Sequence, residues 1–89
     1  MVSKNDVVTI VTPAGEFVGR LISDDDGEVV LANPQMFLNS EQGMGFLPGV
    51  SMTGKQNPET AEFRGVVVMV EASADTVQAW TKVTSGIIL

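Results

Sequence analysis

Hydrophobic and polar positions in the first third of the chain predict two strands joined by a tight turn. Residues 6–12 are apolar or β-branched almost throughout, and the Pro-Ala-Gly sequence at 13–15 has the composition of a turn. Residues 16–23 then alternate, which places Phe17, Gly19 and Leu21 on one face, as in a half-buried strand. We therefore expect a hairpin over residues 6–23.

A polar turn and a third strand follow this hairpin. Residues 24–27 read Asp-Asp-Asp-Gly, and both residue types favour tight turns. Residues 28–32 are predicted to form the third strand. Proline donates no hydrogen bond to a neighbouring strand, so Asn33-Pro34 should interrupt or end it before apolar residues resume at 36–38.

The central segment, residues 39–60, contains too many glycines and prolines for a long regular element. It nevertheless carries five large apolar residues, which are Met44, Phe46, Leu47, Val50 and Met52. A solvated loop does not need them. We expect residues 46–53 to form an extra strand or to cover a contact between subunits.

Residues 61–72 are the strongest strand signal and should form the centre of the fold. Their apolar run leaves both strand faces hydrophobic, so both should be buried, either in the core of one chain or against a neighbouring copy. The run consists of Val66, Val67, Val68, Met69 and Val70. Residues 75–85 are predicted to form a short helix, with Ser73 or Asp75 as its cap, although their β-favouring residues leave a final strand as the alternative.

Length and composition predict one small domain that gains stability from self-association. The chain has 89 residues, so we expect a single domain over 1–89, with a core at 6–72 and a C-terminal extension at 73–89. It contains no cysteine and no histidine, which excludes disulfide bonds and every imidazole-based or thiol-based mechanism. Small cores commonly need an additional stabiliser, and a neighbouring subunit is the remaining candidate.

Charge and hydrophobicity limit the partners of the chain. The net charge of −6 opposes long-range attraction to phosphate, so nucleic-acid contact must rely on local geometry, and we expect no DNA binding. The longest apolar run is far shorter than a membrane-spanning helix, and residues 1–6 lack a signal-peptide pattern. We expect no membrane contact and a cytoplasmic location, in the host cell if a phage encodes the chain.

The order of these elements resembles the Sm and Sm-like (LSm) family. The first matching motif comprises Val8, Ile10, Thr12, Gly15, Phe17, Gly19 and Leu21, followed by the acidic turn and by Val29, Val30 and Leu31. The second comprises Phe63, Arg64 and Gly65 and the apolar run up to Val70. The first turn is one residue shorter than is usual in the family, so the inward set of the first strand is either Val8 and Ile10 or Val7, Thr9 and Val11. The chain looks like a divergent member of the kind carried by bacteriophages, cyanophages among them.

This resemblance implies an all-β fold, a small, strongly bent, five-stranded antiparallel barrel of the SH3-like kind. Sm-like subunits pair edge to edge into rings, so we expect a homo-oligomer of about five to seven subunits whose interface includes residues 66–70. The family binds single-stranded, uracil-rich RNA with the second-motif Arg-Gly, which corresponds to Arg64 and Gly65. Further contacts are expected from the first-motif turn at Asp26, Gly27 and Glu28, which lacks the family's stacking residue and asparagine.

Structural roles remain open for the same residues. Gly65 could belong to a β-bulge, Arg64 could be exposed or ion-paired, and the acidic turn could simply be solvated. A purely structural or protein-binding homo-oligomer of a phage, without RNA binding, is the alternative function. We expect no enzymatic activity, no catalytic residue, no cofactor and no metal site, because the paired carboxylates of the turn have no base or nucleophile beside them.

Overall fold

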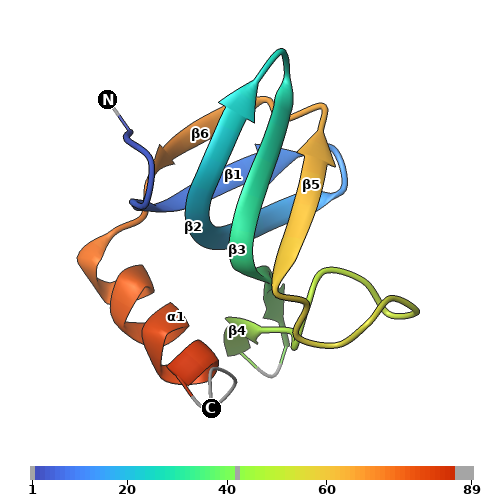
Figure 1. The fold of residues 1–89 in the computed structure, drawn as a ribbon. Helices are drawn as coiled ribbons and strands as arrows, with labels where there is room; N and C mark the ends of the chain where they lie inside the picture. The colour runs from blue at the N-terminus through green and yellow to red at the C-terminus, as the bar shows by residue number, and fades with distance from the viewer. Residues whose placement is uncertain (1, 42, 86–89) are drawn as a thin grey trace.

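The chain folds into an antiparallel sheet with a helix at its C-terminal end (Figure 1). A computed structural model describes residues 2–41 and 43–85. Their strands are β1 (Val7–Thr12), β2 (Gly15–Asp25), β3 (Glu28–Ser40), β4 (Gly43–Phe46), β5 (Thr60–Arg64) and β6 (Val68–Glu71), and their helix is α1 (Ala74–Ser85). The predicted antiparallel strands and C-terminal helix are confirmed, and with this helix the fold is mostly β instead of all-β. The alternative of a final strand in place of the helix is wrong, and the sheet has six strands, not five.

The strands follow the order β4-β3-β2-β1-β6, and β5 pairs with β3 beside this path. All the ladders are antiparallel. Within the described residues, β5 and β6 do not pair with each other, so the sheet is not closed by hydrogen bonds. Each therefore has one strand partner, β3 for β5 and β1 for β6.

β3 changes partner along its length, and the change occurs at Asn33. Its first half pairs with β5 and its last residues pair with β4. Between them Asn33 has a positive φ of 50°, opposite a shift in register between Val18 and Arg20 of β2. The predicted interruption at Asn33-Pro34 is therefore a bend within one strand of 13 residues.

One face of the sheet carries the main core. Its buried members are Val8, Ile10, Phe17, Leu21, Val29, Leu31 and Phe63. The rings of Phe17 and Phe63 contact each other at a centroid distance of 4.9 Å, which links β2 to β5. Val8 and Ile10 are fully buried and Val11 is exposed, so the first of the two predicted registers for β1 is confirmed and the second is wrong.

α1 is held to the bend of β3 by a tryptophan. The indole Nε1 of Trp80 donates a hydrogen bond to the carbonyl oxygen of Asn33 at 2.9 Å, and the Trp80 side chain is buried. The helix begins after Ser73, whose hydroxyl accepts a hydrogen bond from the backbone N–H of Thr76, as a helix cap does. The helix therefore lies at the end of the sheet opposite the β2–β3 turn (Figure 1). No helix among the described residues has the length and apolar character needed to cross a membrane.

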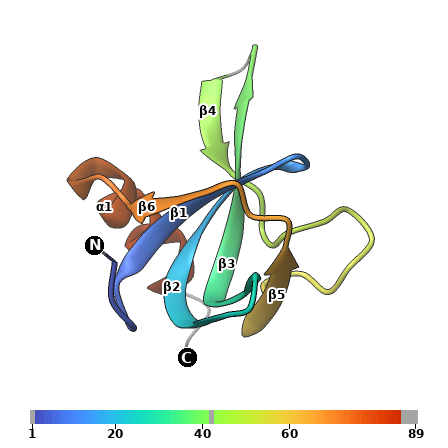
Figure 2. The same ribbon diagram turned by 90° about the horizontal axis from the view of Figure 1, so that it is seen from above.

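The central segment differs from the prediction in its position. The extra strand is β4 at residues 43–46, whereas residues 47–59 form no strand. β4 and the end of β3 project from the rest of the sheet as an arm (Figure 2), in which Phe37 packs edge-on against Phe46. Met44 and Met52 are exposed, so two of the five apolar residues of this segment do not contribute to a core within the chain.

The apolar segment at 61–72 is not one central strand. It breaks at Gly65 into β5 and β6, which both lie at edges of the sheet. Val67, Val68 and Val70 are 70%, 44% and 49% exposed. The expectation that these valines fill the core of a single chain is therefore wrong, because β6 has only β1 beside it.

Candidate nucleic-acid interface

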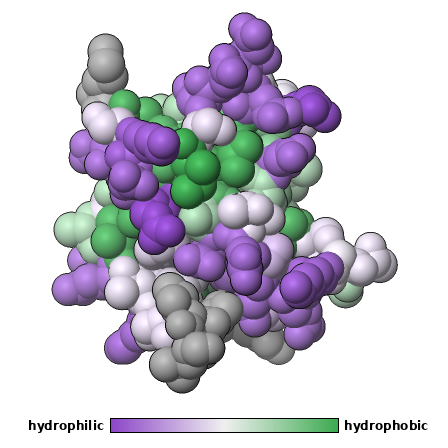
Figure 3. All heavy atoms as spheres, in the orientation of Figure 1, coloured by the Kyte–Doolittle hydropathy of each residue, from purple (hydrophilic) through white to green (hydrophobic). Residues whose placement is uncertain are grey.

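The acidic turn forms the tip of the β2–β3 hairpin. Asp25 and Glu28 are the last paired residues, and Asp26 and Gly27 between them both have positive φ values, 49° and 79°. Two residues of this conformation make the tight turn that best suits the twist of a hairpin, and Asp-Gly is a favoured sequence for it. The tip is consequently polar and exposed, and Figure 3 shows hydrophilic side chains there, above hydrophobic surface over the hairpin.

Arg64 lies beside this turn because β5 pairs with the first half of β3. Its position in the ladder is directly opposite Glu28. The guanidinium Nη2 forms an ion pair with Oε2 of the Glu28 carboxylate. The side chain of Arg64 is still 77% exposed, whereas that of Glu28 is 35% exposed. The planar guanidinium is thus partly held and largely open to solvent.

Gly65 follows at the point where the chain leaves β5. Its φ is 74°, a conformation that side chains with a Cβ rarely adopt, and no atom lies within 4 Å of the position a Cβ would take. The glycine therefore turns the chain from β5 toward β6 and leaves open space over its backbone.

The structure thus brings together the two sets of residues that the sequence analysis singled out. Arg64 and Gly65 lie at the end of the sheet that carries the turn formed by Asp26, Gly27 and Glu28. The local charge is strongly acidic, because the turn carries Asp24, Asp25, Asp26 and Glu28, and of these Glu28 is paired with Arg64. Such a site can stack a planar group on the guanidinium and accept a close backbone contact, but it repels phosphate.

The expected interface residues lie next to this site, on β6 and the segment before it. Val67, Val68 and Val70 are exposed, whereas Val66 and Met69 are half-buried against the core. In β6, Val68 is opposite Val11 of β1, which is also exposed. An apolar strip therefore accompanies the open edge of β6.

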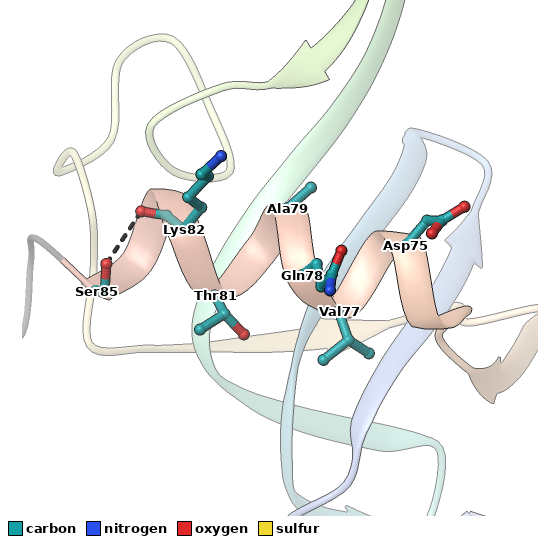
Figure 4. Close-up of a pocket in the computed structure, with 7 residues that line it drawn as sticks. All are labelled: Asp75, Val77, Gln78, Ala79, Thr81, Lys82 and Ser85. Carbon is teal, nitrogen blue, oxygen red and sulfur yellow. Dashed lines mark hydrogen bonds between the residues drawn. The ribbon is translucent and has the colours of Figure 1, made fainter.

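Two hollows in the surface are lined by other residues. One of about 760 Å³ runs along α1, and Figure 4 shows described residues of this helix that line it, among them Asp75, Val77 and Lys82. A second, of about 320 Å³, lies between the start of β1 and the end of β6. In residues 2–41 and 43–85 no group of three acidic side chains has the arrangement of a metal site.

The sequence patterns predicted an RNA contact at Glu28 and left ion pairing open for Arg64, but they did not pair these two residues with each other. The two residues are 36 positions apart, so no local pattern joins them. The order of the strands joins them, since β5 pairs antiparallel with β3 and its last residue therefore lies opposite the first residue of β3. The Trp80–Asn33 contact, 47 positions apart, left no signal in the sequence pattern.

Comparison with known proteins did not extend this description. No protein-family model, no curated protein and no solved structure matches the chain. The function must therefore be argued from the residues themselves.

Proposed function

We propose that the chain is a subunit of a homo-oligomeric, Sm-like ring that binds single-stranded, uracil-rich RNA at Arg64 and Gly65. The observation that carries this proposal is the position of these two residues beside the turn of Asp26, Gly27 and Glu28. Sm-like proteins bind RNA with residues that correspond to the turn and to the Arg64-Gly65 pair. In this chain the turn and the pair are far apart in the sequence. Their proximity supports the resemblance on grounds that are independent of the motifs.

The geometry of the sheet supports a bent, barrel-like subunit. β5 and β6 lie at opposite ends of the series β5-β3-β2-β1-β6, yet only residues 65–67 connect them. In a flat sheet these two strands would be roughly 19 Å apart, whereas the connection spans at most about 14 Å. The short connection therefore supports a curved sheet, to which the bend at Asn33 and the register shifts in β2 would contribute.

Edge pairing between copies supports the ring. An open strand edge beside exposed apolar side chains invites pairing with another chain. β6 has such an edge with Val68 and Val70, and β5 has an open edge on the other side of the subunit. Pairing of β6 with β5 of the next copy uses two different surfaces of the subunit. Repetition of this contact gives a closed ring when the rotation from copy to copy brings the last copy back to the first.

RNA binding would depend on stacking more than on charge. The side chain of Arg64 is 77% exposed, so its guanidinium can lie on a base. The negative charge of the protein opposes stacking on a base less than it opposes contact with phosphate. Gly65 has no Cβ and open space over its backbone, so a nucleotide can approach it closely.

A structural or protein-binding ring without RNA is the second candidate, which a specific observation favours. The turn residues that would face RNA are acidic, and Glu28 already occupies the guanidinium of Arg64. A phage component that binds a protein partner through the acidic end of the ring would need no stacking residue there.

Titration with labelled uracil-rich and adenine-rich RNA at low salt tests the proposal. We expect uracil-selective binding that Arg64→Ala weakens by at least about fivefold, because loss of one stacked base is substantial. Lys55→Ala is the matched control: it also removes one positive charge, from the exposed loop between β4 and β5, and should change binding little. A ring that binds neither RNA would reject RNA binding and favour the second candidate.

A further inference from the structure

We infer that the Glu28–Arg64 ion pair is an autoinhibitory contact that RNA must displace, an inference that rests on the proposed function. The contact joins Glu28, beside the β2–β3 turn, to Arg64 at the end of β5. These two residues are directly opposite each other in the ladder of five residue pairs between β3 and β5. The backbone pairing therefore holds the two side chains opposite each other whether or not RNA is present. The ion pair fixes where the guanidinium lies, so a base that stacks on it in any other position must first break the pair.

The exposure of the two partners supports competition and argues against a structural role. Arg64 is 77% exposed and Glu28 is 35% exposed, so the pair is accessible and adds little to stability. Neither side chain belongs to the core. The pair does control the direction of the guanidinium, because Nη2 of Arg64 contacts Oε2 of Glu28.

A neutral residue at position 28 should release the arginine. Exposed ion pairs correspond to about a two- to fivefold change in an equilibrium constant, so Glu28→Gln should tighten the binding of a short oligouridine by about that factor. Part of any gain could come from the loss of one negative charge on an acidic protein. A control with the same charge change is therefore required.

Glu62→Gln provides this control. Glu62 lies on the same strand as Arg64, is exposed, and pairs in the ladder with Val30 instead of an ionisable residue. It makes no ion pair among the described side chains. Both substitutions change the net charge equally, so a general electrostatic effect predicts equal gains in affinity, whereas the autoinhibitory contact predicts a larger gain for Glu28→Gln.

The experiment is a titration of labelled oligouridine against the wild-type protein, Glu28→Gln, Glu62→Gln, Arg64→Ala and the double variant Glu28→Gln/Arg64→Ala. Circular dichroism and native mass establish that each variant folds and assembles like the wild type. We expect the gain from Glu28→Gln to exceed that from Glu62→Gln and to disappear when Arg64 is absent.

Two outcomes overturn the inference and are distinguishable. If the wild type binds and the two glutamine variants gain equally, the autoinhibitory contact is rejected while the proposed RNA function stands. If neither the wild type nor any variant binds oligouridine at low salt, the RNA function and the inference both fail.

Discussion

Gly19 shows how single residues determine the shape of the sheet. A Cβ built at this position lies 3.0 Å from the Cβ of Leu31 and 3.1 Å from the carbonyl oxygen of Ala32. The backbones of β2 and β3 therefore approach closely at Gly19, next to the register shift between Val18 and Arg20 and close to the bend at Asn33. The absence of a side chain at Gly19 permits this approach.

Gly19→Ala should lower the free energy of unfolding by about 1–3 kcal/mol, because the added methyl group must displace packed backbone and the Leu31 side chain. Urea denaturation followed by circular dichroism measures the change. Gly45→Ala is the control, since a Cβ there has no atom within 4 Å, and it should change stability by less than about 0.5 kcal/mol. Equal stabilities for the two variants would contradict the close approach.

At the scale of elements, the hydrophobic pattern predicted most strands but not their partners. Alternation located β1 and β2, and the Asp-Gly turn located the hairpin that joins β2 to β3, because these signals are local. The pattern at 61–72 was misleading, since apolar residues on both faces do not distinguish a buried central strand from an edge strand such as β6, whose valines are exposed. The contact between Glu28 and Arg64 also depends on tertiary pairing of the strands, which no local pattern reveals.

The docking of α1 is the element-scale feature that the sequence pattern missed. Trp80→Phe keeps an aromatic ring but removes the N–H that binds the Asn33 carbonyl, so it should lower the free energy of unfolding by about 1–2 kcal/mol. Urea denaturation followed by far-ultraviolet circular dichroism checks this. Ser85→Ala removes an exposed hydroxyl from the end of the same helix and should have little effect. An unchanged stability for Trp80→Phe would mean that this hydrogen bond does not secure the helix.

At the scale of the whole molecule, the proposed ring would cover the exposed valines and the open edge of β6. A chain of this size with several large apolar residues on its surface is a poor candidate for a stable, solitary monomer. The net charge of −6 works against assembly, since like-charged copies repel, so the proposed ring would rely on apolar contact and strand pairing.

Substitution of an interface valine should therefore break the ring. Val68→Glu places a charge on the edge strand β6 and should shift the protein to smaller species. Val83→Glu is matched to it, because Val83 on α1 is 43% exposed and Val68 is 44% exposed. Size-exclusion chromatography of both variants should show disassembly for Val68→Glu alone, with unchanged circular dichroism. Disassembly of both, or of neither, would contradict an interface at β6.

The most direct test of the account is the native mass of the unmodified protein, measured by light scattering over a range of concentrations. One chain has a mass of 9.4 kDa. The account predicts a discrete assembly of about five to seven chains that persists on dilution, as expected for a closed ring. A mass equal to that of a single chain at all concentrations would contradict the ring and, with it, the assignment of β5 and β6 as mutually pairing edges.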